Sequence, residues 1–153
     1  QTLGCKGSID DLVPGNVIAL KSIKYDVSSF LNASNDNDYM KVREAQAPRG
    51  SHFTRICECF LVVSAGNGRV AFYSPWYQKF VHSDSSNYLR NGNLSKVCSM
   101  YDRPRMDESF TVKKANNSKA EDLSVKIFSV ADNPQEIRFK NSSGLSYGSS
   151  FHV

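Results

Sequence analysis

The feature that most constrains the fold is a series of short apolar runs that are separated by turn-forming residues. Within most runs apolar and polar side chains alternate, and Gly, Pro, Asn or Asp stands between them, which is typical of strands and turns. We expect strands at residues 17–22, 29–34, 39–44, 53–63, 69–74, 79–84, 88–90, 109–113, 123–130 and 136–140. Many short strands at nearly regular spacing predict an all-β fold, either a barrel or a sandwich.

A short pattern recurs three times along the chain. Ile18-Ala-Leu-Lys-Ser22 is echoed by Val70-Ala-Phe-Tyr-Ser74 and by Ile137-Arg-Phe-Lys-Asn141. Each copy places two apolar side chains on one face of a strand. The first residues of the copies lie 52 and 67 residues apart, so we expect the third unit to be irregular.

Each copy is followed by a polar bend and a second short strand, which we place at 30–34, 80–84 and 145–147. An aromatic residue is then expected to close each unit, and the candidates are Phe53, Phe110 and Phe151. Three such units predict hairpins that surround one shared apolar core, with polar loops that are free to vary for binding.

This arrangement resembles the β-trefoil superfamily, most closely fascin-type repeats, and it is related to the lobes of ricin-type lectins. The resemblance covers residues 17–153, and residues 1–16 are expected to form an N-terminal arm. It implies a single β-trefoil-like domain over 1–153 with three hairpin units. The Q-x-W signature of ricin-type lobes is absent, and an antiparallel β-sandwich remains the alternative fold.

Four cysteines, Cys5, Cys57, Cys59 and Cys98, predict two disulfides and an oxidising compartment. In a strand, Cys57 and Cys59 would point to the same face, and they are too close to bridge each other comfortably. We therefore expect one of them to pair with Cys5 and the other with Cys98. A zinc site is the weaker alternative because Cys5 and Cys98 stand alone, and no metal or other cofactor is expected.

Other features also favour a secreted protein. Four N-x-S sequons begin at Asn32, Asn93, Asn116 and Asn141, and these asparagines are candidate glycosylation sites. The chain begins at Gln1 rather than Met, as it would after removal of a signal peptide. No apolar run is long enough to cross a bilayer, so no membrane span is expected.

The charge pattern and the motif content argue against nucleic-acid binding and catalysis. The net charge is only +4, and the basic residues are scattered rather than gathered on one segment. The three histidines, His52, His82 and His152, stand in no motif that pairs them with a nucleophile, and no known hydrolase, metalloprotease or nucleotide-binding motif is present. We therefore expect a binding protein and not an enzyme.

A carbohydrate-binding lectin is the leading function. Sugars are held by planar polar groups together with an aromatic face, and the loops offer such sets at Asn35, Asp36, Asn37 and Asp38, at Trp76, Tyr77, Asp84, Ser86 and Asn87, and at Tyr147. The structural alternative is that the Asn and Asp residues only form turns and that Trp76 plugs a barrel end.

Two other functions compete with the lectin. A protein-binding ligand, such as a growth-factor-like protein, a toxin or an inhibitor, would use the irregular loops at 45–51 and 99–107 to bind a cell-surface glycoprotein. A structural component of an extracellular secretion is the third alternative.

Overall fold

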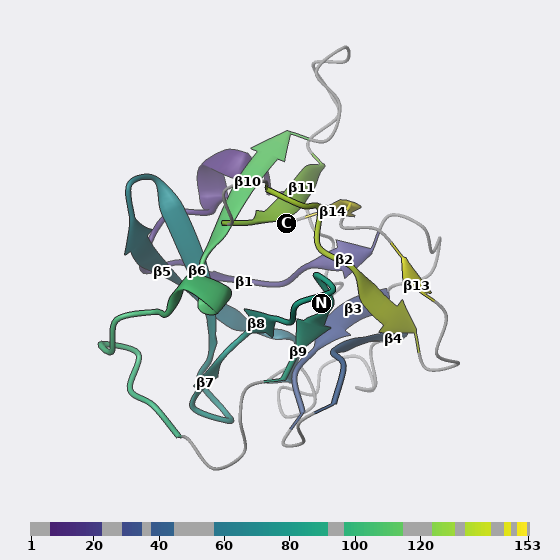
Figure 1. The fold of residues 1–153 in the computed structure, drawn as a ribbon, viewed down its shortest axis with the longest axis horizontal. Helices are drawn as coiled ribbons and strands as arrows, with labels where there is room; N and C mark the ends of the chain where they lie inside the picture. Colours follow the sequence, from purple (N-terminus) through teal and green to yellow (C-terminus); the bar gives the residue numbers. More distant parts are fainter. Residues whose placement is uncertain are drawn as a thin grey trace.

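The structure is a computed structural model, and it describes residues 7–22, 29–34, 38–44, 57–91, 97–114, 124–130, 134–141, 146–147 and 150–152. These residues form an all-β fold, as the sequence predicted (Figure 1). The named helical elements are two short 3-10 turns, η1 (Ile9–Asp11) and η3 (Met106–Glu108). Within the described ranges no helix is long and apolar enough to cross a membrane.

The strands lie largely within the predicted ranges, because alternation of apolar and polar residues fixes which face of each strand is buried. The main difference is in the 53–63 run, where the strand begins at Phe60 and continues to Gly66. The strands are β1 (Val17–Ile18), β2 (Lys21–Ser22), β3 (Ser29–Asn32), β4 (Lys41–Glu44), β5 (Phe60–Gly66), β6 (Arg69–Ser74), β7 (Lys79–Phe80), β8 (His82–Ser83), β9 (Leu89–Arg90), β10 (Phe110–Lys114), β11 (Val125–Ser129), β12 (Phe139–Asn141), β13 (Ser146–Tyr147) and β14 (Ser150–His152).

Part of the sheet closes into a ring. The hydrogen-bonded order runs β1-β5-β6-β10-β11-β14-β2, and β1 and β2 belong to the same segment, residues 17–22. This segment therefore pairs with β5 at one end and with β14 at the other, and all neighbours in the ring are antiparallel. A closed ring leaves none of these strands as a free edge.

The register of the ring repeats three times. In each unit an aliphatic residue of one strand pairs with a buried phenylalanine of the next, and the three pairs are Ile18 with Phe60, Val70 with Phe110, and Val125 with Phe151. The same three strands share the pattern apolar-x-apolar-x-Ser, and their serines are Ser22, Ser74 and Ser129. All nine of these side chains lie at or below 9 % exposure.

The threefold repeat was therefore predicted in two of its three copies. The third copy is Val125-Lys-Ile-Phe-Ser129, 55 residues after Val70, and not Ile137 to Asn141. The 139–141 strand alternates in the same way, but it pairs with β4 and β13 outside the ring. The residue that closes the first unit is Phe60; Phe53 lies outside the described residues.

Three hairpins cover one side of the ring; in Figure 1, β3, β4 and β13 lie to the right of the centre, and β8 and β9 lie near the centre. They are β3–β4, the β8–β9 hairpin that continues β7, and β12–β13. Each hairpin touches the other two, through the β4–β12 pairing and the isolated bridges Tyr39–Arg90 and Tyr88–Arg138. The three units thus meet around a common centre.

The core fills the inside of the ring and of the hairpins. Its largest members are fully buried, namely Phe30, Phe60, Phe110, Phe139, Phe151, Leu20, Leu31, Leu89, Ile127 and Ile137. The space at its centre is too small for a water molecule, so the interior of the ring holds side chains and no ligand cavity. A second, smaller cluster of Ala71, Tyr73 and Phe80 lies with Leu61, Val63 and Cys98.

The N-terminal segment is packed against this body. Leu12 is buried in the core, and η1 is closed by hydrogen bonds between Ser8 and the Asp10 and Asp11 positions. Gly15 adopts a φ of +100°, which favours glycine, and its N–H donates to the Val62 carbonyl. The described part of the predicted arm, residues 7–16, therefore contacts the ring.

Candidate functional site

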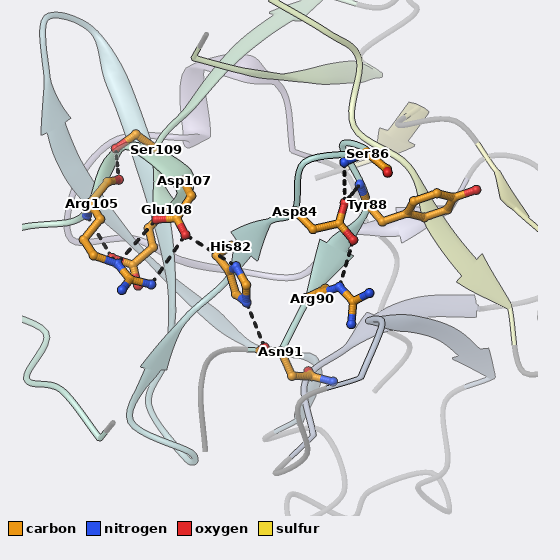
Figure 2. A network of polar contacts seen from close by, with 10 residues as sticks. All are labelled: His82, Asp84, Ser86, Tyr88, Arg90, Asn91, Arg105, Asp107, Glu108 and Ser109. Atoms are coloured by element: carbon orange, nitrogen blue, oxygen red, sulfur yellow. Dashed lines mark hydrogen bonds and ion pairs between the residues drawn. The ribbon is translucent and has the colours of Figure 1, made fainter. Parts of the chain in front are cut away.

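The predicted ligand residues Asp84, Ser86 and Asn87 form a hydrogen-bonded turn. One Asp84 oxygen accepts the backbone N–H groups of Ser86 and Tyr88 at 2.9 and 3.0 Å, and the other accepts Nε of Arg90 at 2.8 Å (Figure 2). Burial alone would raise the pKa of Asp84, but these hydrogen bonds and the Arg90 charge lower it below its usual value. The carboxylate is thus committed to the turn.

The rest of this turn joins two hairpins. Asn87 takes a left-handed conformation with φ of +66°, and its carbonyl accepts the backbone N–H of Arg138 at 2.7 Å. The Arg138 guanidinium donates to the Ser86 carbonyl, also at 2.7 Å, and lies over the Tyr88 ring. Ser86 and Asn87 therefore hold the third unit to the second.

Aromatic rings and guanidinium groups continue this joint into the first hairpin. Tyr88 meets Tyr39 edge to face at 5.2 Å, and Arg90 lies 4.0 Å above the Tyr39 ring. In space the side chains follow one another in the order Arg138, Tyr88, Tyr39, Arg90. The two tyrosines come from two different hairpins. Stacked cation–π pairs of this kind hold elements together, and they identify the joint as structural.

In the first hairpin only part of the predicted ligand set is described. Asp38 is exposed, its carboxylate accepts the N–H of Tyr39 at 2.8 Å, and it lies 3.9 Å from the Lys41 ammonium. Asn35, Asp36 and Asn37 lie outside the described residues. Tyr147 belongs to β13, where the structure describes the backbone.

Trp76 is a surface residue. It lies in the turn between β6 and β7 and is 60 % exposed, so the alternative that it plugs the barrel is wrong. Its neighbour Tyr77 is half-buried and packs against the core. The turn therefore exposes the indole of Trp76 while the adjacent Tyr77 holds the turn against the core.

Tyr77 lines a hollow beneath this turn, which we call the Tyr77 hollow. Its free space is about 10 Å³, enough for about one water molecule, and it is lined by four apolar residues and by Ser34, Ser74, Tyr77, Lys79 and Asn91. Asn91 fixes its shape, because its amide accepts the N–H of Ser34 at 2.8 Å and donates to the Ser34 hydroxyl at 3.0 Å. A space of this size holds a single water molecule, so a larger ligand at this turn would lie on the surface above it.

The sequence analysis found Trp76 and Tyr77 but missed the other polar members of the hollow. Lys79 is buried at 4 % exposure beside the buried Phe80, whereas alternation from Phe80 predicts that Lys79 faces outward. Asn91 and Ser34 are 57 residues apart, so no local pattern could join them.

His82 connects the second hairpin to the segment that precedes β10. Its Nε2 lies 3.2 Å from the Asn91 carbonyl oxygen, and its Nδ1 lies 3.6 Å from a carboxylate oxygen of Asp107 (Figure 2). Asp107 in turn lies within 3.5 Å of the Arg105 guanidinium. The network ties η3 to the Tyr77 hollow through Asn91.

The cysteines differ from the expectation. The structure describes no disulfide among Cys57, Cys59 and Cys98, and Cys5 lies outside the described residues. The Cys98 thiol lies instead 3.6 Å from the Gln78 carbonyl, and the Cys57 sulfur lies 3.5 Å from the Tyr77 hydroxyl. The Cys98 side chain packs into the Tyr73–Phe80 cluster, where burial raises the pKa of its thiol.

Among the sequons, Asn32 is the one whose side chain is described. It is half-buried in β3, and its amide nitrogen donates to the Phe30 carbonyl at 2.8 Å. Asn141 lies in β12, where the backbone is described, whereas Asn93 and Asn116 lie outside the described residues.

No protein-family model matches the sequence, and no curated protein does. Similar solved structures exist, however. A GH54 α-L-arabinofuranosidase aligns with a TM-score of 0.59 at 14% identity, over 99% of this chain and 28% of that chain. This chain therefore spans about a quarter of the length of that enzyme.

Two toxin structures are also similar. The cytolethal distending toxin of Haemophilus ducreyi aligns with a TM-score of 0.56 at 11% identity, over 89% of this chain and 71% of that chain. The corresponding toxin of Actinobacillus actinomycetemcomitans gives the same TM-score and identity, with 78% of its chain covered. At these identities the likeness concerns the fold alone.

Proposed function

We propose that this chain is a non-enzymatic, carbohydrate-binding domain of the β-trefoil superfamily, with its ligand held at the Trp76 turn. The observation that carries the proposal is the 60 % exposure of Trp76, an indole displayed from a turn whose next residue, Tyr77, packs against the core. A sugar ring has one apolar face and several hydroxyl groups, so it needs an aromatic surface and nearby polar groups together.

The exposure of Trp76 favours a binding role over a structural one. Burying a side chain of this size would stabilise the fold by roughly 2 kcal/mol or more, and the chain leaves that stabilisation unused. Trp76 is the only tryptophan among 153 residues, and it stands at a turn rather than in the core.

The repeated architecture supports assignment to the β-trefoil superfamily. The three equivalent register pairs, the closed ring and the three mutually contacting hairpins are what a threefold domain requires. The alignment of nearly the whole chain with about a quarter of an arabinofuranosidase is compatible with a domain that works beside a carbohydrate-active enzyme.

A glycan array with the natively folded protein tests the function, and titration of the hits by Trp76 fluorescence gives their affinities. Because Trp76 is the only tryptophan, any change in emission reports on this site. Trp76→Ala lacks the fluorescent reporter, so its affinity is measured by calorimetry, and it is expected to bind about tenfold more weakly than the natural protein.

Tyr101→Ala is the matched control, since Tyr101 is an aromatic side chain with 86 % exposure on another loop. It should leave sugar affinity unchanged. Absence of binding to every sugar on the array, or equal losses in Trp76→Ala and Tyr101→Ala, would overturn the proposal.

We further propose that the protein is secreted and glycosylated, on the support of its four sequons. Mass spectrometry of protein from its natural source is expected to find glycans at Asn93, Asn116 or Asn141. Asn32 is expected to stay unmodified because its amide is engaged with Phe30. Unmodified asparagines at all four sequons would contradict this proposal.

A further inference from the structure

His82 lies at the junction between the second hairpin and the segment that contains η3. It belongs to β8, and its side chain is 17 % exposed. Its Nε2 lies 3.2 Å from the Asn91 carbonyl oxygen, and its Nδ1 lies 3.6 Å from a carboxylate oxygen of Asp107 (Figure 2). Both ring nitrogens therefore face an oxygen atom.

The contact with Asn91 fixes which nitrogen of the neutral ring carries the hydrogen. A carbonyl oxygen can only accept a hydrogen bond, so the hydrogen must be on Nε2. A neutral imidazole has one N–H group, and Nδ1 is then left with a lone pair. That nitrogen is buried and has no hydrogen-bond partner among the described residues. In the neutral ring, a buried acceptor thus faces the negatively charged acceptor of Asp107.

A second proton on the ring removes this mismatch. The imidazolium carries an N–H group on each nitrogen, so Nδ1 becomes a donor that faces the Asp107 carboxylate. The present separation of 3.6 Å is longer than an N–H···O hydrogen bond, so a movement of a few tenths of an ångström would complete one. The hydrogen bond from Nε2 to the Asn91 carbonyl also becomes charge-assisted, and therefore stronger.

The charged groups of the η3 segment favour this second proton. They are the carboxylates of Asp107 and Glu108 and the guanidinium of Arg105, whose Nε lies 3.4 Å from an oxygen of each carboxylate. Two carboxylates against one guanidinium leave one negative charge beside the His82 ring. Partial burial of the ring opposes a positive charge, and this negative charge offsets that cost.

The charged groups of the hairpin itself are balanced. Arg90 of β9 is the register partner of His82, and its guanidinium is paired with the Asp84 carboxylate at 2.8 Å. This pair is neutral as a whole. The Asp107 carboxylate is therefore the group that answers a change of charge on His82.

We propose that the His82–Asp107 contact is a proton-sensitive link that holds η3 to the second hairpin more tightly at acid than at neutral pH. Histidine side chains change their charge between about pH 5 and pH 8. Because the proton binds better when η3 is attached than when it is detached, attachment strengthens as the pH falls and weakens as it rises. Asp107 is 45 % exposed, so water screens the interaction and we expect an effect of about threefold on the equilibrium of attachment.

Nitrogen NMR of the His82 ring tests the first step. At about pH 8 the hydrogen of the neutral ring is expected on Nε2. A hydrogen on Nδ1 would overturn the proposal, because that nitrogen could then donate to Asp107 without any second proton.

Asp107→Asn tests the role of the carboxylate by NMR titration of the same ring. The variant loses the negative charge, and its amide can donate to the neutral Nδ1, so the proton affinity of His82 is expected to fall by about threefold. Asp102→Asn is the matched control, since Asp102 is an exposed carboxylate whose hydrogen bond goes to the Ser99 N–H at 2.8 Å. An unchanged titration in Asp107→Asn, or equal changes in both variants, would contradict the proposal.

Amide hydrogen exchange shows whether the proton acts on η3. The N–H groups of Glu108 and Ser109 donate to the carbonyls of Arg105 and Met106 at 3.0 and 3.3 Å. After correction for the intrinsic effect of pH, their protection is expected to rise by about threefold between about pH 8 and pH 5 in the natural protein. It should stay constant in Asp107→Asn. Protection in the natural protein that does not change with pH would refute the link, whatever the outcome for sugar binding.

Discussion

Single polar side chains decide how this fold is held together at its turns. Asp84 satisfies two backbone N–H groups and one guanidinium, and Asn91 joins two hairpins whose partners are far apart in sequence. The sequence analysis offered Asp84 both as a candidate ligand residue and as a turn former, because a carboxylate can serve either purpose. The structure adds the ion pair with Arg90, which the local sequence does not predict and which holds the Asp84 carboxylate within the turn.

Asp84→Asn is expected to lower the free energy of unfolding at neutral pH by about 1–2 kcal/mol, because the charged acceptor of Arg90 is lost. The pKa of Asp84 is lowered in the folded state, so its contribution is complete above the unfolded value of about 3.9. That contribution disappears as the pH falls through the folded value. Urea unfolding from neutral to acid pH should therefore show the variant and the natural protein converging.

Asp102→Asn is the control for this prediction, as Asp102 is exposed and accepts one backbone hydrogen bond. Its effect on stability should be below about 0.5 kcal/mol. A pH-independent difference between Asp84→Asn and the natural protein would show that the charge of Asp84 contributes nothing.

The three equivalent serines of the ring differ in how their hydroxyl groups are satisfied. Ser22 is 1 % exposed and its hydroxyl finds no hydrogen-bond partner among the described residues, whereas the Ser129 hydroxyl accepts the N–H of Gln135 at 3.2 Å. Ser22→Ala is therefore expected to stabilise the protein by up to about 1 kcal/mol, and Ser129→Ala to destabilise it by about 1 kcal/mol. Chemical denaturation of both variants measures the sign, and two losses of equal size would contradict the assignment.

At the scale of elements, the strands were predictable and their partners were not. Alternation of side chains located the strands of the ring because each has one face in the core. The third copy was misplaced because residues 125–129 and 137–141 show the same alternation of apolar and polar side chains. Only the strand pairing shows that 125–129 belongs to the ring and that 139–141 belongs to a hairpin. Phe60 was missed for the same reason, since Phe53 offers the same local pattern.

The threefold register predicts that its phenylalanines are energetically equivalent. Phe60, Phe110 and Phe151 are all fully buried, and each faces an aliphatic partner. Phe→Leu at each position is expected to lower the free energy of unfolding by about 1–2 kcal/mol. Thermal or urea unfolding of the three single variants measures this, and a loss confined to one position would contradict the equivalence.

At the scale of the whole molecule, the ring and the hairpins should differ in local stability. The ring strands β5, β6, β10 and β11 have paired neighbours on both sides, whereas β8 and β9 form a separate two-stranded sheet. Amide groups of the ring are therefore expected to exchange hydrogen more slowly than those of β8 and β9. Native-state hydrogen exchange with peptide resolution measures the order, and faster exchange in β10 and β11 would contradict it.

The closure of the ring by residues 17–22 has a consequence for misfolding. Residues 17–22 pair with β5 through β1 and with β14 through β2. If this segment detaches, β5 and β14 both become unpaired edge strands. Such edges recruit other chains by strand addition. Substitutions that detach residues 17–22 should therefore cause the protein to polymerise rather than yield a less stable monomer.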